Sequence, residues 1–200
     1  MKLNVRRDDI DFGTNILKVK VPKELRNKCA TGLDYIDTTL GGHGFTPSMV
    51  TMFTGTPGAG KTTMMLIMAD SLARQGKLVV FNTAEESLHQ VKMVVERLGL
   101  KNGFMVGQET HTPTLLEKCD AIRNKRGNKN KQFVLIVDSL QCMEDGQYNY
   151  INSRTPERVL QQITEWAKTH YTMAMIVGQV NKGGQMSGTN KLKHMVDAML

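Results

Sequence analysis

The sequence predicts an α/β fold, a mostly parallel twisted sheet with helices on both faces. From Thr31 onwards, short apolar runs alternate with stretches of helical periodicity, as in successive βαβ units. The run Phe133–Val137 (FVLIV) is uninterrupted and rich in β-branched residues, which is typical of a strand buried on both faces of a parallel sheet. The 200 residues suffice for one domain with a full hydrophobic core.

The amino-terminal segment differs in character from the rest of the chain. Residues 1–30 are charged and weakly patterned, with one strand expected around Ile16–Val21. We therefore divide the chain into an amino-terminal extension over residues 1–30 and a core over residues 31–200.

The first half of the core contains two strand–helix units. Val50–Thr54 is a strand-like run that ends at a glycine-rich turn, and Lys61–Arg74 has apolar residues at helical spacing. Leu78–Phe81 is the next expected strand. Ser87 and Gln90 then form a capping box, which predicts the start of a second helix.

The second half repeats this alternation. Thr112 and Thr155 each precede a proline, a pattern that predicts a capped helix with proline at its first position. We expect these helices to end near Asn124 and His170. The remaining strands are expected at Phe104–Val106, at Ala174–Val177 and from about His194.

The charge balance favours a polyanionic partner. Twenty-six Lys and Arg residues against 19 Asp and Glu residues give a net charge of +7. Many soluble proteins are mildly basic, so charge alone indicates nucleic acid only weakly. The basic stretch at 123–131 (RNKRGNKNK) is interpreted as a solvated surface turn, with a nucleic-acid patch as the alternative.

Cysteine usage and hydropathy limit the possible classes of protein. The three cysteines are far apart and form no C-x-x-C pair, which excludes a zinc ribbon within this sequence and gives no disulfide framework. The sequence has no apolar signal-peptide region and no long apolar run. We therefore expect free thiols, no membrane span and a cytoplasmic location.

The strongest motif is GTPGAGKT at residues 55–62, a full G-x-x-x-x-G-K-S/T phosphate-binding loop. It follows an expected strand and opens an expected helix, where backbone N–H groups and the positive helix end can bind phosphate oxygens. The sequence therefore predicts an ATP site. Its expected nucleotide-binding residues are Gly55, Thr56, Pro57, Gly58, Ala59, Gly60, Lys61, Thr62 and Thr63.

Three further positions complete this predicted site. Lys61 can reach the β- and γ-phosphates, while the Thr62 hydroxyl and Asp138, at the end of the buried strand, can hold Mg²⁺. Glu85 lies just beyond the carboxyl end of an expected strand, and ligands bind at the carboxyl ends of the strands in a parallel sheet. Glu85 could therefore deprotonate the attacking water. Glu86 is interpreted as a carboxylate in the first helical turn.

Several segments resemble one family of ATPases in the same order. Thr31–Asp37 with Leu40–Gly42 resembles the opening T-G-x-x-x-x-D-x-x-L-G-G of RadA, KaiC and archaeal RecA-like ATPases. Val137–Gln141 (VDSLQ) and His194–Asp197 (HMVD) resemble segments of RadA, as does TAEESL at 83–88. The chain is thus similar to the ATPase core of the bacterial RadA (Sms) recombination proteins.

The resemblance implies a RecA-like P-loop ATPase that handles single-stranded DNA in recombination or repair, with ATP and Mg²⁺ as cofactors and a hexameric ring as its assembly. It adds Gln179, as a γ-phosphate sensor, to the catalytic set of Lys61 and Glu85. Residues 142–154 and 181–192 match the two loops that face DNA. The expected DNA contacts are Lys182, Lys191 and Lys193.

The sequence also departs from the RadA pattern. It shows neither the four-cysteine zinc module nor the protease-like domain of RadA, it has glutamine at position 179 in place of histidine, and it stops at Leu200. We therefore expect the carboxy-terminal part of the usual core to be missing, as in a minimal relative or a truncated chain. The alternatives are a DnaB-type replicative helicase core and a KaiC-like or loader module that nucleotide binding switches.

Overall fold

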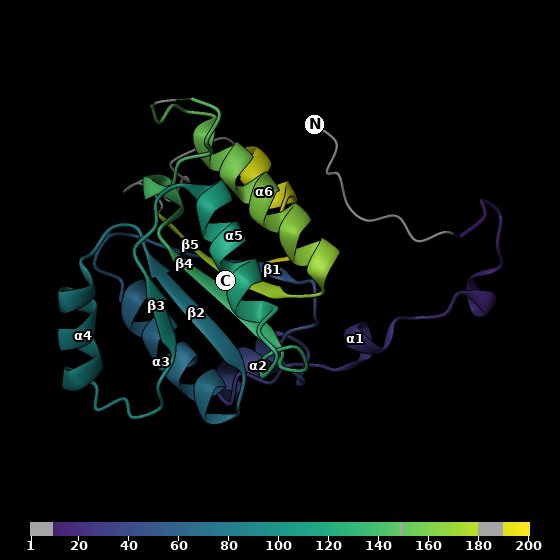
Figure 1. The fold of residues 1–200 in the computed structure, drawn as a ribbon, viewed down its shortest axis with the longest axis horizontal. Coiled ribbons are helices and arrows are strands. Elements are labelled where there is room, and N and C mark those ends of the chain that lie inside the picture. The colour runs from purple at the N-terminus through teal and green to yellow at the C-terminus, as the bar shows by residue number, and fades with distance from the viewer. Residues whose placement is uncertain (1–9, 149, 180–189) are drawn as a thin grey trace.

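A computed structural model describes residues 10–148, 150–179 and 190–200, and its centre is a six-stranded sheet. The strands lie in the order β3-β2-β4-β5-β1-β6, and every pair within the sheet is parallel (Figure 1). This confirms the predicted parallel α/β fold. The strands are β1 (Val50–Gly55), β2 (Leu78–Thr83), β3 (Met105–Gly107), β4 (Phe133–Asp138), β5 (Met173–Gln179) and β6 (Ala198–Met199).

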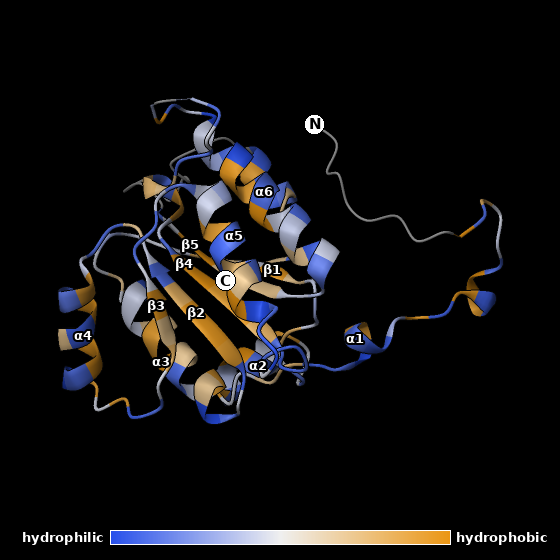
Figure 2. Cartoon of the chain, viewed as in Figure 1, coloured by the Kyte–Doolittle hydropathy of each residue, from blue (hydrophilic) through white to orange (hydrophobic). Residues whose placement is uncertain are grey.

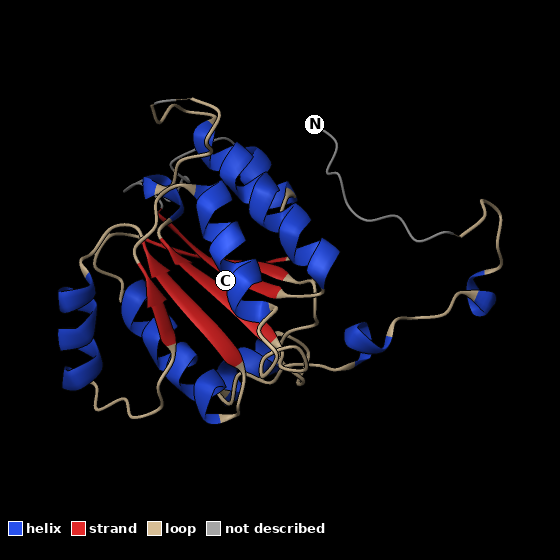
Figure 3. Ribbon diagram, viewed as in Figure 1, coloured by secondary structure: helices blue, strands red, loops and turns tan. Residues whose placement is uncertain are grey.

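Helices cover both faces of the sheet, as Figure 3 shows. α5 and α6 pack on one face, while α2, α3 and α4 lie on the other. The α-helices are α1 (Lys23–Arg26), α2 (Asp34–Thr39), α3 (Lys61–Arg74), α4 (Leu88–Arg97), α5 (Thr112–Arg123) and α6 (Thr155–His170). The described part of the chain also contains three short 3₁₀ helices, η1 (Ile16–Lys18), η2 (Leu140–Cys142) and η3 (Asn190–His194).

The central strands are buried on both faces because they contribute to two hydrophobic clusters. In β4, Leu135 and Val137 point to the cluster under α5 and α6, whereas Val134 and Ile136 point to the cluster under α3. Every residue of β4 is buried, and the strands are the most continuously apolar part of the chain in Figure 2. Burial on both faces explains the uninterrupted apolar run in the sequence.

Both predicted threonine caps are wrong by one residue. His111 caps α5, with its Nδ1 accepting from the Thr114 N–H, and Thr112 is already helical and buried. Arg154 occupies the cap position of α6 without a side-chain bond, because the Thr155 hydroxyl accepts from the Asn152 N–H instead. The capping box of α4 at Ser87 is confirmed.

Two expected strands also differ. The apolar stretch Ile16–Val21 contains the 3₁₀ helix η1 instead, where Asn15 accepts from the Leu17 N–H. This segment extends away from the sheet, so it has no neighbouring strand to pair with (Figure 1). His194 ends η3 rather than beginning a strand, and β6 starts only at Ala198.

Within the described residues, no helix is both long enough and apolar enough to cross a membrane.

A stability prediction follows from the tight turn at Gly44. A Cβ there would lie 2.2 Å from the Cys29 carbonyl oxygen, and the φ angle is +71°. Gly41 has a similar φ of +85° but open space around it. We expect Gly41→Ala to cost about 1 kcal/mol of backbone strain, and Gly44→Ala to cost about 2 kcal/mol more because of the clash. Urea unfolding of the two variants measures the difference, and equal losses would contradict the packing described.

Candidate nucleotide site

The phosphate-binding loop connects β1 to α3. β1 ends at Gly55, α3 begins at Lys61, and the residues between them are exposed. Gly58 and Gly60 have φ angles of +79° and +82°, which L-side chains rarely adopt. The Lys61 ammonium donates to the carbonyl oxygens of Gly55 at 2.9 Å and Thr56 at 2.8 Å. The structure thus places the predicted motif on a strand–loop–helix turn, with its lysine held over the loop.

The expected metal ligands lie in direct contact. The Thr62 hydroxyl donates to Asp138 Oδ2 at 2.6 Å, joining the first turn of α3 to the last residue of β4. Burial raises the pKa of Asp138, and the two nearby glutamates raise it further, while the Thr62 hydroxyl and Lys61 lower it. A buried carboxylate beside a hydroxyl suits a hard cation such as Mg²⁺, which prefers oxygen ligands and would relieve the cost of the buried charge.

The Glu85 carboxylate accepts hydrogen bonds from residues at the ends of two other strands. Gln179, the last residue of β5, donates from Nε2 to Glu85 Oε2 at 3.0 Å and to Oε1 at 3.3 Å. Ser139, directly after β4, donates from its hydroxyl to Oε2 at 3.1 Å. Two donors therefore fix the orientation of the carboxylate that the sequence indicated as the general base. Of these three residues, Glu85 and Gln179 were predicted from the sequence, and Ser139 was not.

The register of the sheet brings these residues to one edge. Thr83 of β2 lies opposite Asp138 of β4, and Gly55 of β1 lies opposite Gln179 of β5. A hydrogen bond of 2.7 Å from the Ala84 N–H to the Asp138 carbonyl continues this pairing beyond β2. The carboxyl ends surround a cavity of about 360 Å³. It is lined by Pro57, Gly58, Gly60, Lys61, Thr62, Thr63, Glu85, Glu86, Val94, Arg97, Asp138, Val177 and Gln179.

Two lining residues change the sequence-based interpretation. Glu86 does not lie in the first turn of α4. It precedes the Ser87 cap, and its backbone N–H and carbonyl both bond to the Thr83 hydroxyl. Arg97, in the last turn of α4, also lines the cavity, and its place could not be predicted because it depends on how α4 packs.

Comparison with known proteins finds sequences that are similar to this chain. A family model described as "ATPase: KaiC" matches residues 29–105. "DNA repair protein RadA" of Aquifex aeolicus (strain VF5) is 32% identical over 181 residues, covering 89% of this chain and 38% of the relative. The RadA of Mycobacterium tuberculosis (strain CDC 1551 / Oshkosh) is 29% identical over 177 residues, covering 86% and 35%. The chain thus spans little more than a third of these relatives.

Solved structures share the fold at low sequence identity. One of them, described as an ATPase domain, superposes with a TM-score of 0.70 and 13% identity, covering 86% of this chain and 75% of that one. A DnaB-like replicative helicase, described together with its interactions with primase, gives the same TM-score and identity, covering 86% and 51%. This chain has the fold of RecA-like ATPase domains.

The RecA-like fold keeps two of the expected DNA-binding lysines away from the nucleotide cavity. Lys191 and Lys193 are exposed on η3, and the Lys191 ammonium lies 3.8 Å from Glu157 of α6. Neither of them lines the nucleotide cavity, so the structure does not bring them together with Lys61. The third, Lys182, lies outside the described residues.

The first of the two loops that the resemblance assigns to DNA is partly built into the folded domain. Met143 and Asp145 are buried, and Glu144 forms a bridge with His111. The described residues at 146–148 and 150–154 are exposed, apart from the half-buried Asn152, and residue 149 is not described.

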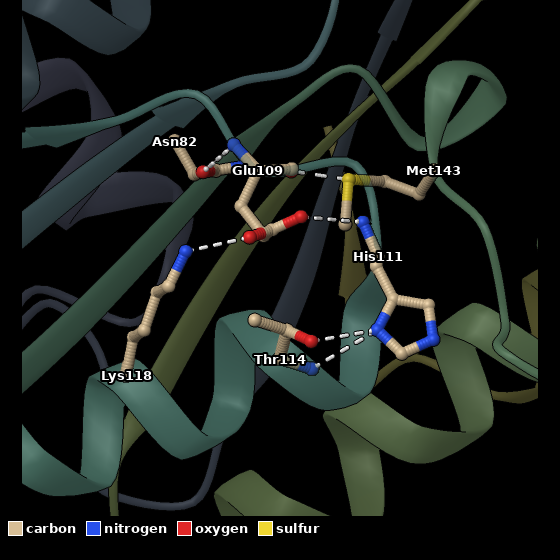
Figure 4. Close-up of polar contacts among 6 residues, drawn as sticks. All are labelled: Asn82, Glu109, His111, Thr114, Lys118 and Met143. Carbon is tan, nitrogen blue, oxygen red and sulfur yellow. Dashed lines mark hydrogen bonds and ion pairs between the residues drawn. The ribbon is translucent and has the colours of Figure 1, made fainter.

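A polar cluster at the ends of β2 and β3 anchors this loop (Figure 4). The buried Asn82 amide donates to the Glu109 carbonyl at 2.8 Å and accepts from the Glu109 N–H at 3.0 Å. The Glu109 carboxylate accepts from the Lys118 ammonium and the His111 N–H, and the bond to Lys118 lowers the pKa of Glu109. Asn82 lies on β2, and the chain continues from the end of β2 to Glu85 of the nucleotide site. The polar cluster and the nucleotide site are therefore connected through this strand. Its role is structural support.

A stability prediction concerns Asp138. Because burial raises its pKa, the unfolded chain releases this proton at lower pH than the folded chain does. The free energy of unfolding therefore falls as pH rises from the unfolded to the folded pKa, and stays reduced at neutral pH. Asp138→Asn removes the charge and keeps an oxygen that can accept from Thr62.

We expect this variant, free of metal and nucleotide, to be more stable than the wild type at neutral pH, with the difference shrinking in acid. It should also bind Mg-ATP more weakly. Urea unfolding in a chelating buffer across pH, with calorimetry of Mg-ATP binding, measures both effects. A variant less stable at neutral pH would contradict the cost assigned to the buried charge.

Proposed function

We propose that this chain binds ATP with Mg²⁺, hydrolyses it, and couples hydrolysis to the handling of single-stranded DNA in recombination or repair. The observation that supports hydrolysis most directly is the convergence of Lys61, Thr62, Glu85, Asp138 and Gln179 on one cavity. A site with only a phosphate loop could bind nucleotide. The oriented carboxylate of Glu85 is the feature that adds chemistry.

Each residue has a distinct task in this proposal. The loop N–H groups and Lys61 bind the phosphates, and Thr62 with Asp138 would hold Mg²⁺, which supplies neutralisation of charge on the phosphate oxygens. Glu85 positions a water and accepts its proton. Gln179 and Ser139 hold the Glu85 carboxylate, so a change at the γ-phosphate can be transmitted to β5 and to the segment after β4.

Action on DNA is supported by the RadA relatives, which are described as DNA repair proteins, and by the net charge of +7. Assembly into a ring rests on the family resemblance alone. The division at residue 30 and the cytoplasmic location also remain predictions. A KaiC-like module switched by nucleotide is a second candidate, because the matching family model carries that description. A replicative helicase is a third, suggested by fold alone.

The catalytic assignment predicts a contrast between neighbouring glutamates. Glu85→Gln should bind Mg-ATP but hydrolyse it about 100-fold more slowly, the usual scale for losing a general base. Glu86→Gln is the matched control, since the Glu86 contacts to Thr83 are made by its backbone and should persist. Steady-state hydrolysis and calorimetry measure the two effects. The reverse ranking would assign the base to Glu86.

The proposed function is tested by ATP hydrolysis with and without single-stranded DNA. We expect DNA to accelerate hydrolysis by the wild type. Hydrolysis that ignores DNA would favour the KaiC-like module, and displacement of a strand from a duplex would favour the helicase. Lys61→Ala, which removes the charge at the phosphates, should abolish tight Mg-ATP binding and provides the baseline for both assays.

A further inference from the structure

The positive charge of the chain is concentrated in two short segments, residues 18–28 and 123–131. Of the 26 Lys and Arg residues, ten lie in these segments, and of the 19 Asp and Glu residues only Glu24 does. The rest of the chain therefore has 16 basic against 18 acidic residues, a net charge of −2. The whole positive excess of the chain comes from two segments that are far apart in the sequence.

The fold brings these two segments together at the end of the sheet where the strands begin. Gln132, directly after the second segment, donates from Nε2 to the carbonyl oxygen of Asn27 in the first. Figure 1 shows α1, which belongs to the first segment, beside this end of the sheet. Both segments line a cavity of about 590 Å³, the first with Lys23, Glu24 and Asn27, the second with Arg123 and residues 129–131.

Backbone contacts hold both segments in place. Directly after the first segment, Cys29 exchanges two backbone hydrogen bonds of 2.8 Å with Phe45, and both residues are fully buried. Within the second, the Asn128 N–H donates to the Lys125 carbonyl oxygen at 2.8 Å, and the Lys131 N–H donates to that of Asn128 at 2.9 Å. The Asn128 side chain donates to a carbonyl oxygen of α5. The turn is thus ordered without its basic side chains.

Most of these cations have no anionic partner. Arg123 is paired with Asp120, at 3.1 Å. Within the described part of the chain, the other nine form no ion pair, and all nine are exposed: Lys18, Lys20, Lys23, Arg26, Lys28, Lys125, Arg126, Lys129 and Lys131. Like charges gathered on one surface repel one another and raise the local positive potential, which attracts a polyanion.

We propose that the two segments form one basic surface that binds the sugar–phosphate backbone of duplex DNA without reading its sequence. Exposed Lys and Arg side chains, and amides such as that of Asn130, are the usual donors to phosphate oxygens. The basic surface lies where the strands begin, whereas the nucleotide cavity lies at their carboxyl ends. This inference goes beyond the proposed action on single-stranded DNA and does not depend on it.

The composition of the basic surface favours a duplex over an unpaired strand. Neither segment contains an aromatic residue, whereas proteins that bind single strands commonly stack the bases on exposed aromatic rings. Of the rings that line the cavity, Phe133 is buried, and His170 and Tyr171 are half-buried. A duplex offers about one negative charge per 1.7 Å of its axis, so a surface of cations alone suffices to bind it.

The test measures binding of a short fluorescent duplex by anisotropy over a range of salt concentrations, without nucleotide. K125Q/R126Q/K129Q/K131Q removes four cations of the turn, and K23Q/R26Q removes two from α1. Each phosphate contact that is lost should flatten the slope of log affinity against log salt by about 0.9. We expect the slope to flatten by about 2 or more in the first variant and by about 1 or more in the second.

K92Q/K101Q is the matched control for the α1 variant, because it also removes two exposed cations, one on α4 and one shortly after it. α4 lies on the opposite side of the molecule from α1 in Figure 1. This control should give the slope of the wild type. Urea unfolding and calorimetry of Mg-ATP binding should be unchanged in both basic-surface variants, because backbone contacts and Asn128 hold the turn.

Two results would overturn the basic surface as a duplex site. One is a wild type that binds no duplex even at low salt. The other is a slope that stays the same in the wild type and both variants. If vesicles containing phosphatidylserine then bind the wild type and not the variants, the basic surface contacts a membrane instead.

Hydrolysis of ATP separates this inference from the proposed function. Stimulation of hydrolysis by single-stranded DNA should persist in both variants, and its loss together with duplex binding would assign the basic surface to single strands instead. If single-stranded DNA does not stimulate the wild type, the proposed function fails, whereas duplex binding that depends on the two segments would still establish the basic surface.

Discussion

The parallel pairing of β2 with β4 and of β1 with β5 is the constraint on which the site depends. These registers place Thr83 opposite Asp138 and Gly55 opposite Gln179, so the strands end at one edge. The phosphate loop, the buried carboxylate and the oriented Glu85 lie on different segments of the chain and meet only there. A one-residue slip of β4 would turn Asp138 towards the opposite face of the sheet and separate it from Thr62.

The nucleotide site also lowers the stability of the domain, because it contains a buried carboxyl group. Asp138 is an acid buried against a strongly apolar sheet, and burial raises its pKa. Such a group destabilises the domain until a cation is bound, so Mg-ATP should stabilise the fold as well as occupy the site. The two hydrophobic clusters on either face of the sheet provide the stability that tolerates this buried charge.

The nucleotide site and the loop that carries Tyr148 and Tyr150 are both connected to the end of β4. Ser139, which bonds to Glu85, immediately precedes η2, and the loop that carries Tyr148 and Tyr150 follows η2. A change in the position of Glu85 can therefore reach this loop through a short segment of chain. A second contact, from the Gln179 side chain, links Glu85 to the end of β5. Coupling through these contacts is part of the proposed function and shares its tests.

The sequence by itself determined the strand–helix alternation, the phosphate loop and the identity of Lys61, Thr62, Glu85 and Asp138, because glycine spacing, apolar runs and strand-end carboxylates are local signals. Other features were decided only by tertiary structure. The Ile16–Val21 segment, which has no neighbouring strand, contains the 3₁₀ helix Ile16–Lys18, where Asn15 accepts from the Leu17 N–H. The Thr155 hydroxyl accepts from the Asn152 N–H and does not cap α6. The hydrogen bond from Ser139 to Glu85 joins residues 54 positions apart in the chain, and no local sequence pattern encodes such a contact.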